Sequence, residues 1–252
     1  MASIETERGR IGLIDTGSGD RTPIVFLHGV GSDKSVWKPQ LDYFGQSRRA
    51  LAFDYPGYGE SEAAPDATRD DFASAMLAAI DTLGIRQAHI CGLSLGGVVA
   101  IALHSVAPDR CASLILADSF AVHPQGQAIY ERGLAASADM RGLAEARIGA
   151  LLVSEEPRAG AIETMVRIDP EAYRTGARAV WLADQRERAA AIRVPALVIC
   201  GDEDAITSSI AEGSMPVRST RALRTAAPRS AGCQSFSAPS RLPPAVRTAS
   251  TI

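Results

Sequence analysis

The sequence lacks any run of 18 consecutive apolar residues, and its first ten residues, MASIETERGR, lack the apolar segment of a secretion signal. We therefore expect no membrane-spanning helix, no membrane partner and a cytoplasmic location. The four cysteines, Cys91, Cys111, Cys200 and Cys233, are not spaced as metal ligands, so we expect reduced thiols and no bound metal. A net charge of -3 also gives no reason to expect nucleic acid as a partner. The composition leaves the oligomeric state open.

Short apolar runs alternate with helical patterns along the first half of the chain. The apolar runs, typical of strands buried on both faces of a sheet, cover residues 23–27, 50–53, 88–91 and 112–117, and one more follows the helical stretch at 195–200. Residues 11–15 read as a further short strand that ends in a turn. Helical spacing covers residues 37–44, 72–83 and 98–106, and Thr68 with Asp71 resembles a capping box before the second of these. This alternation predicts an α/β fold with a mainly parallel sheet covered by helices on both faces.

The strand pattern disappears between residues 119 and 192. Gly133, Gly142, Gly149 and Pro157 divide this stretch into short helical pieces, and residues 171–192 read as one longer helix. We therefore expect a helical cap at 119–192, inserted into a core made of residues 1–118 and 193–207.

Residues 91–97, CGLSLGG, connect an apolar strand to an apolar helix and read as a nucleophile elbow. In a Gly-x-Ser-x-Gly turn the serine is strained, and the two glycines leave room for the chain around it. Ser94 is then the candidate nucleophile, and the N–H of Leu95 is a candidate donor to an oxyanion. A Gly/Ser-rich turn can also be an ordinary connection between a strand and a helix. The neighbouring motifs have to distinguish these two interpretations.

The glycine-rich bend His28–Gly31 follows the first buried strand and supplies a second candidate donor, the N–H of Val30. His28 is either a catalytic base or a residue that hydrogen-bonds this loop into shape, and we expect the second role. Asp54 stands at the end of the next strand. We expect it to bind backbone N–H groups of the following loop, although a catalytic role is an alternative.

The order of these motifs resembles the α/β-hydrolase superfamily from residue 11 to about residue 207. The resemblance rests on His28-Gly29, on Asp54-x-x-Gly57-x-Gly59-x-Ser61, on Gly92-x-Ser94-x-Gly96, and on a late strand that ends in Gly201-Asp202-x-Asp204. Residues 81–97 and 194–199 look most like 3-oxoadipate enol-lactonases, although related esterases and carbon–carbon hydrolases share most of these residues. The resemblance implies a serine nucleophile, no cofactor, and a small ester or lactone substrate from aromatic degradation.

The resemblance also implies a catalytic triad in the chain order serine, acid, histidine. Asp204 matches the position of the acid, although a turn residue that caps a strand end is the plain alternative, and Asp118 is a weaker substitute. No histidine follows His123. His104 lies two to three turns along the helix after Ser94, which is too far for a hydrogen bond to the serine.

Residues 208–252 differ in composition from the rest of the chain. They contain nine serines, six arginines and five prolines against a single acidic residue, Glu212, and we recognise no strand or useful amphipathic helix among them. We expect a poorly ordered tail. A genuine disordered tail and a reading frame shifted near Thr207 both explain this composition, and the second is our preferred hypothesis.

Two classes of function follow from this sequence. The first is a serine hydrolase of a small ester or lactone, impaired by the missing histidine, with a carbon–carbon bond hydrolase as a variant. The second is a non-catalytic hydrolase scaffold that binds a small ligand. If the lactonase resemblance holds, a cap arginine could pair with a substrate carboxylate, and the candidates are Arg132, Arg141, Arg174 and Arg178, each of which is otherwise a solvated helix residue.

Overall fold

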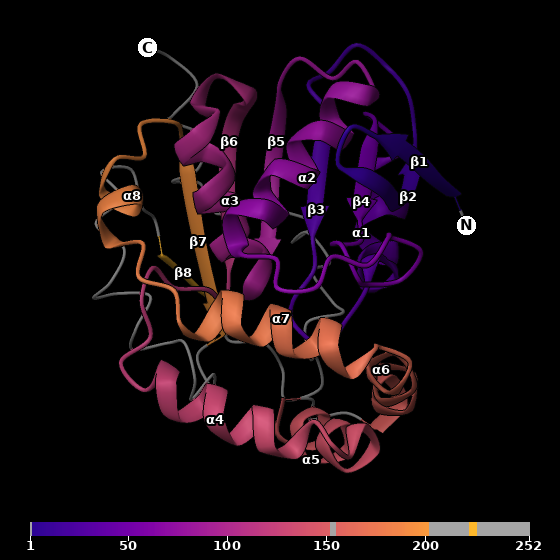
Figure 1. The fold of residues 1–252 in the computed structure, drawn as a ribbon. Helices are drawn as coiled ribbons and strands as arrows, with labels where there is room; N and C mark the ends of the chain where they lie inside the picture. Colours follow the sequence, from indigo (N-terminus) through magenta and orange to yellow (C-terminus); the bar gives the residue numbers. More distant parts are fainter. Residues whose placement is uncertain (1, 152–154, 202–221, 226–252) are drawn as a thin grey trace.

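A computed structural model describes residues 2–151, 155–201 and 222–225, and these form one eight-stranded sheet with helices around it (Figure 1). The strands are β1 (Ala2–Thr6), β2 (Gly9–Thr16), β3 (Ile24–Leu27), β4 (Ala50–Phe53), β5 (Ala88–Leu93), β6 (Cys111–Ala117), β7 (Ala196–Gly201) and β8 (Ala222–Thr225). The order across the sheet is β1-β2-β4-β3-β5-β6-β7-β8. β1 and β2 pair antiparallel, as do β2 and β4, and all the other pairs are parallel. This confirms the predicted α/β-hydrolase fold class.

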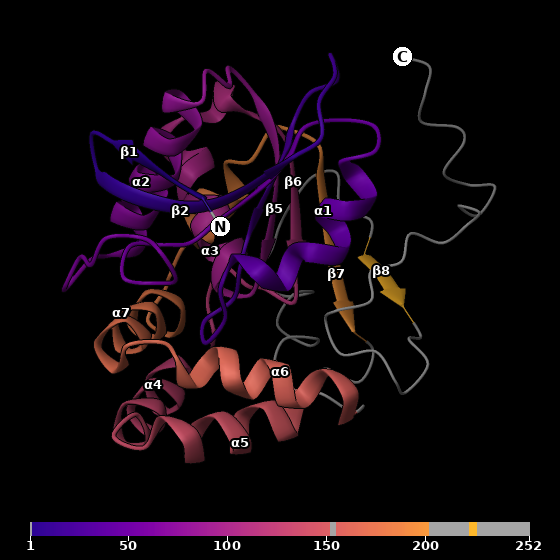
Figure 2. The same cartoon turned by 90° about the vertical axis from the view of Figure 1, so that its right-hand side faces the viewer.

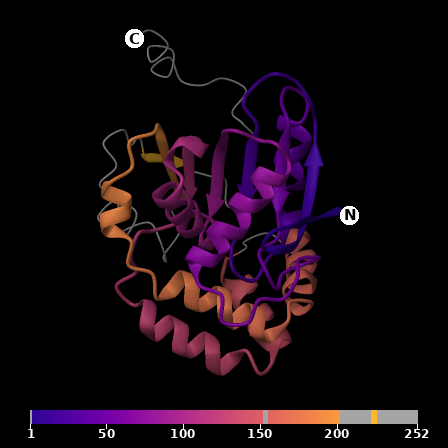
Figure 3. The same ribbon diagram turned by 45° about the horizontal axis from the view of Figure 1, so that its top comes forward.

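The helices fall into two groups, which cover the faces of the sheet and one of its ends. They are η1 (Lys34–Trp37), α1 (Lys38–Phe44), α2 (Arg69–Thr82), α3 (Leu95–Val106), η2 (Pro108–Arg110), α4 (Gly126–Ala136), α5 (Met140–Leu151), α6 (Glu155–Val166), α7 (Pro170–Trp181) and α8 (Arg186–Ala190). Figure 2 shows α1 on one side of the sheet and α2 and α3 on the other. The helices α4–α7, which we call the cap helices, gather at the end toward which the parallel strands point, as Figure 3 also shows.

Both faces of the central strands are buried, as the continuous apolar runs predict. In β3 the side chains of Val25 and Leu27 join the core beneath α2 and α3, whereas Ile24 and Phe26 join the smaller core beneath α1. This alternation follows from the two-residue period of a strand, because successive side chains point to opposite faces. A strand between two helical layers therefore needs apolar residues at every position.

The α2 helix begins where the sequence predicts. The side chain of Thr68 accepts a hydrogen bond from the N–H of Asp71, and the carboxylate of Asp71 accepts one from the N–H of Thr68. Both halves of the capping box are present, although aspartate replaces the usual glutamate or glutamine. The helix then buries Phe72, Met76 and Ile80 against the sheet.

The expected helix over residues 171–192 was wrong, because it is divided into α7 and α8. The connecting residues are tied to the core: the N–H of Gln185 donates to the carbonyl of Ala121 at 2.8 Å, and its side-chain amide donates to the carbonyl of Val98 at 2.9 Å. These long-range hydrogen bonds replace the backbone hydrogen bonds that would continue the helix. The three glycines expected to separate the cap helices lie inside α4 and α5 instead, since packing outweighs a helix-propensity cost of about 1 kcal/mol.

Two further strands were missed from the sequence. β1 forms a hairpin with β2, and its largely exposed residues carry no buried apolar pattern. β8 was expected to be absent, since no strand was recognised within residues 208–252, yet it pairs in parallel with β7. Four residues are too few to show a period, and the main chain of an edge strand accepts a partner through backbone hydrogen bonds alone. The other residues of 208–252 lie outside the described part of the chain.

The packing of α7 against the core depends on Gly176. A methyl group there would overlap the hydroxyl of Tyr58 and lie 3.4 Å from Cδ2 of Leu95. Tyr58 is fully buried and packed against the ring of His28, so it cannot move aside. Gly160 in α6 is a matched control, because a methyl group there would meet nothing within 4 Å.

We predict that Gly160→Ala stabilises the protein by up to about 1 kcal/mol through helix propensity. Gly176→Ala should lower the free energy of unfolding by about 1–2 kcal/mol, because overpacking exceeds the gain in propensity. Urea denaturation of both variants provides the measurement. Equal stabilisation by the two substitutions would contradict the close packing of α7 on Tyr58.

Candidate active site

Ser94 occupies the turn between β5 and α3 with a backbone conformation that only glycine adopts readily. Its φ is 52° and its ψ is -111°. A side chain at Gly92 would overlap the main chain of Gly96, and a side chain at Gly96 would overlap the carbonyl of Leu27. The two glycines therefore allow the first turn of α3 to lie against both β5 and β3. This is the steric arrangement that the Gly-x-Ser-x-Gly pattern predicts.

Hydrogen bonds to residues at the end of the neighbouring strand β6 hold the strained turn in place. The N–H of Ser94 donates to the carbonyl of Ala117 at 2.9 Å, and the hydroxyl of Ser119 donates to the carbonyl of Ser94 at 2.9 Å. Ser119 is fully buried. Sequence reasoning missed Ser119, because a serine just beyond a strand has no spacing that marks it. Its position shows that the end of β6 helps to fix the conformation of Ser94.

Two backbone N–H groups beside Ser94 have no acceptor among the described residues. They belong to Val30, in the loop after β3, and to Leu95, the first residue of α3. Because β3 and β5 are neighbours, the two loops meet at the same end of the sheet. A methyl group at Gly29 would lie 3.6 Å from Cβ of Ser94. Unpaired N–H groups on adjacent loops can stabilise a negatively charged oxygen.

The hydroxyl of Ser94 likewise forms no hydrogen bond with a described residue. His28 is therefore not in position to act as its base. The Nδ1–H of His28 donates to the carbonyl of Gly29 at 2.9 Å, and its ring lies 4.5 Å from that of Tyr55. Burial lowers the pKa of His28, against the opposing charge of Asp54. The neutral imidazole therefore shapes the loop that carries Val30, as expected.

His123 and His89 have other hydrogen-bond partners, and His104 lies far along α3. His123 follows β6, and its Nδ1 accepts the N–H of Gln125 at 3.1 Å, which places the proton of the neutral ring on Nε2. His89 contacts Ser113 at the other end of β5. His104 lies nine residues beyond Leu95 in the unbroken α3 helix, about 13 Å along its axis. Its distance from Ser94 agrees with the sequence estimate.

Asp54 has the structural role expected for it. It is fully buried and accepts hydrogen bonds from the N–H of Lys34 at 2.8 Å and from the N–H of Glu60 at 3.2 Å. The buried ammonium of Lys34 lies 2.5 Å from the same carboxylate and also contacts Glu60. Burial raises the pKa of Asp54, and the interactions of its carboxylate with His28 and with Lys34 oppose this shift. The carboxylate thus ties the loop after β4 to the loop after β3.

Of the two candidate acids, Asp118 lies among the described residues. Asp118 follows β6 with a φ of 43°, and its carboxylate accepts the N–H of Gly201 at 3.1 Å, which joins the ends of β6 and β7. Asp204, the residue matched to the acid of the triad, lies outside the described residues. Among the described residues, no cluster of histidine, cysteine or carboxylate side chains could hold a metal ion.

Most of the cap arginines expected to meet a substrate are engaged by the protein itself. Arg141 pairs with Glu163, Arg174 with Glu171 and Arg178 with Asp66. Arg132 is exposed on α4. Arg147 on α5, which was not among the candidates, places its guanidinium over the ring of Trp181, 5.8 Å from the ring centre.

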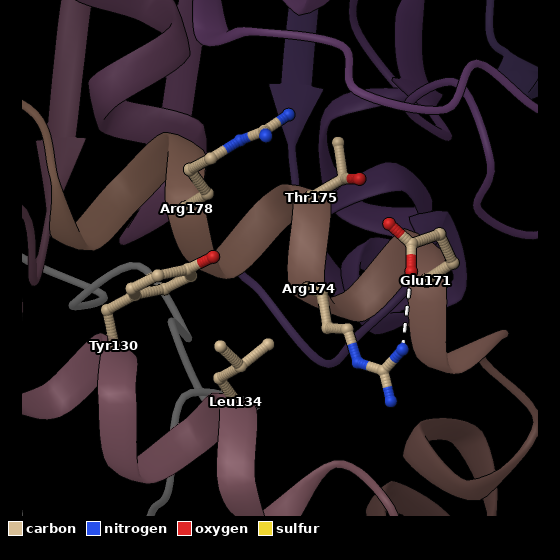
Figure 4. Close-up of a pocket in the computed structure, with 6 residues that line it drawn as sticks. All are labelled: Tyr130, Leu134, Glu171, Arg174, Thr175 and Arg178. Carbon is tan, nitrogen blue, oxygen red and sulfur yellow. Dashed lines mark hydrogen bonds and ion pairs between the residues drawn. The ribbon is translucent and has the colours of Figure 1, made fainter.

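A cavity of about 400 Å³ lies between α4 and α7 (Figure 4). Its lining residues are Tyr130, Leu134, Glu171, Arg174, Thr175 and Arg178. In Figure 4 the ion pair of Arg174 and Glu171 occupies one side, and Tyr130 and Leu134 rise from α4 toward α7. All six residues belong to cap helices, and neither Ser94 nor its immediate neighbours line this cavity.

Comparison with known proteins agrees with this geometry. Residues 24–239 match the model of the Alpha/beta hydrolase family, which extends beyond residue 207, where the expected resemblance ended. The chain belongs to the alpha/beta hydrolase family. Within the residues that the structure describes, no helix is long and apolar enough to cross a membrane.

Two relatives resemble the chain over most of its length, and a third resembles less than half of it. It is 27% identical over 216 residues to 3-oxoadipate enol-lactonase 1 of Acinetobacter baylyi, covering 81% of this chain and 80% of the relative. The crystal structure of the enol-lactonase from Burkholderia xenovorans LB400 superposes with a TM-score of 0.82 at 26% identity, covering 89% and 91% of the two chains. A 2-hydroxy-6-oxononadienedioate/2-hydroxy-6-oxononatrienedioate hydrolase of Paraburkholderia phymatum is 36% identical over 113 residues, 42% of this chain and 39% of the relative. The expected likeness to enol-lactonases is confirmed.

The buried contact between Asp54 and Lys34 generates a stability prediction. Asp54→Asn keeps the shape of the side chain but leaves the ammonium of Lys34 with less compensation, and we expect a loss of about 3–5 kcal/mol. Asp42→Asn is the matched control, because it breaks the exposed pair with Lys38 and should change stability by less than about 1 kcal/mol. Chemical denaturation measures both, and equal losses would mean that burial of the pair is unimportant.

Proposed function

We propose that the chain is a serine hydrolase of small esters or lactones. The observation that carries the proposal is the strained conformation of Ser94 beside two unpaired N–H groups, those of Val30 and Leu95. In this mechanism the hydroxyl of Ser94 attacks the substrate carbonyl, and the two N–H groups stabilise the oxyanion of the tetrahedral intermediate. The similarity to enol-lactonases supports the choice of substrate class.

The proposed triad is incomplete in the printed sequence. We assign Asp204 the role of the orienting carboxylate by its match to the family motif, but no histidine follows His123 to act as the base. Without a base the serine keeps its proton. Loss of one triad member leaves roughly 10³–10⁴-fold catalysis over water, which comes from the oxyanion hole and binding. We therefore propose slow turnover, in a cytoplasmic enzyme whose substrate is a small molecule.

The cap helices complete the proposed site. Met165 of α6 is fully buried, and its sulfur would lie 3.1 Å from a methyl group placed at Gly31, in the loop that carries Val30. Gly176 of α7 packs beside Leu95. Residues of the cap helices therefore cover both proposed oxyanion donors. We propose that residues 119–192 govern access of the substrate.

A carbon–carbon bond hydrolase is a second candidate function. The partial similarity to the Paraburkholderia phymatum hydrolase supports it, and the same oxyanion site would serve a ketone carbonyl. A scaffold that binds a ligand without turnover is the third. Hydrolysis of a simple ester separates the enzyme from the scaffold, because the scaffold gives no rate that depends on Ser94.

We predict that a fluorophosphonate probe labels Ser94 slowly and that the purified chain hydrolyses p-nitrophenyl acetate faster than Ser94→Ala does. The expected rate is well below an ordinary kcat of about 1–10³ s⁻¹, because the base is missing. Mass spectrometry locates the label. Labelling at another residue with Ser94 unmodified would contradict the assignment of the nucleophile.

Supplying a base should restore turnover. Replacing residues 208–252 by the corresponding end of a 3-oxoadipate enol-lactonase, with its histidine, should raise ester hydrolysis by about 10²-fold or more. The control is the same chimera with that histidine changed to alanine. If the unmodified chain already turns over at an ordinary rate, the proposal of an incomplete triad fails, and His123→Ala tests whether His123 supplies the base.

A further inference from the structure

The cavity of about 400 Å³ between α4 and α7 is lined by no residue of the site proposed for hydrolysis. Its six lining residues occupy one face of each helix, at i, i+3, i+4 and i+7 on α7 and at i and i+4 on α4. Five of the six carry a polar group, and Leu134 is the exception. The volume lies in the range of small-molecule sites, ~300–1,000 Å³. The cavity therefore suits a small polar ligand.

Thr175 contributes a hydroxyl group without a partner to this cavity. The residue is only 4% exposed, yet its hydroxyl forms no hydrogen bond with a described residue. Other helical threonines, such as Thr82 and Thr164, donate to the carbonyl four residues earlier. Buried polar groups in folded proteins usually have partners, so an exception calls for an explanation. Figure 4 shows the phenol of Tyr130 directed from α4 toward α7, and this hydroxyl also has no partner among the described residues.

The two guanidinium groups of the cavity are already paired with carboxylates. Arg174 pairs with Glu171 at 3.3 Å and donates from Nε to the hydroxyl of Ser137 at 2.8 Å. Arg178 pairs with Asp66 at 3.3 Å. An anionic ligand would have to compete with these two carboxylates for the guanidinium groups. A guanidinium has five N–H donors and a carboxylate about four acceptor positions, so each pair keeps unused donors and acceptors for a neutral ligand.

We propose that this cavity binds a neutral, polyhydroxylated molecule of the size of a monosaccharide. Each hydroxyl group of a sugar both donates and accepts hydrogen bonds, which matches the hydroxyls of Thr175 and Tyr130 and the unused positions of the ion pairs. The ring of Tyr130 and the side chain of Leu134 supply an apolar wall for the C–H groups of the sugar ring. Because the walls belong to both α4 and α7, the bound sugar connects these two helices.

The test is calorimetric titration of the full chain with methyl β-D-glucopyranoside, a neutral sugar whose ring cannot open. Thr175→Val and Tyr130→Phe each remove one hydroxyl and nearly keep the shape of the side chain. We expect each to weaken binding about three- to tenfold, the effect of one hydrogen bond between neutral groups. Thr164→Val and Tyr43→Phe are the matched controls, because they remove the same groups outside the cavity and should leave binding unchanged.

Two further probes test the class of ligand. Cyclohexylmethanol has a ring of the same size with a single hydroxyl group, and we expect it to bind far more weakly than the pyranoside. Glutarate, an anion, should not displace the pyranoside. If glutarate binds more tightly than the pyranoside and Arg174→Gln abolishes its binding, the cavity is an anion site and the proposal is wrong.

The remaining outcomes also decide the proposal, and none of them depends on turnover by Ser94. If the pyranoside does not bind, or if Thr175→Val and Thr164→Val weaken its binding equally, the sugar site is wrong. Loss of binding in Ser94→Ala would place the sugar at the turn after β5 and would likewise overturn the proposal. Thermal unfolding without ligand shows whether each variant folds. Tyr130→Phe, at a half-buried position, keeps the test valid if Thr175→Val does not fold.

Discussion

The first turn of α3 must lie directly against the ends of β5 and β3, and much of the site depends on this contact. Gly96 rests on the carbonyl of Leu27, and Gly92 rests on Gly96. With this contact in place Ser94 adopts a strained conformation, which costs about 1–3 kcal/mol. The burial of α3 and of β5 compensates for that cost, because nearly every residue of α3 is buried. The strain at Ser94 is therefore maintained by the core of the whole molecule.

The same contact arranges the groups around Ser94. With β3 beside β5, the loop of Val30 is brought to the N-terminus of α3, and the unpaired N–H groups of the two loops become neighbours. The loop of Val30 is in turn fixed by His28 and by the buried pair of Asp54 and Lys34. Two of these groups, His28 and Asp54, have the residue types of catalytic acids and bases. Their burial and hydrogen bonds assign them to support of the loop.

The sequence predicts the parts of the fold that repeat a pattern or fill a core. The continuous apolar runs of β3 and β4, the capping box of α2 and the glycines around Ser94 each have a single physical explanation. Features that depend on distant contacts were missed. Ser119 is an ordinary polar residue in sequence, and its role comes from the elements packed beside it. The division of the helix at Gln185 and the pairing of β8 likewise depend on backbone partners that local periodicity does not encode.

The proposed oxyanion site and the position where the family order places the histidine belong to separate parts of the chain. The contacts that hold Ser94 come from Leu27, Gly92, Gly96, Ala117 and Ser119, all of which precede the cap helices. In the chain order of the family, the histidine follows the acid of the triad, and this position is far along the chain from the contacts that hold Ser94. A change confined to the C-terminal segment would therefore leave the strained turn and its two N–H donors in place. Such a chain would still bind and polarise a carbonyl group, because hydrogen bonds to the carbonyl oxygen do not depend on the group that deprotonates the serine.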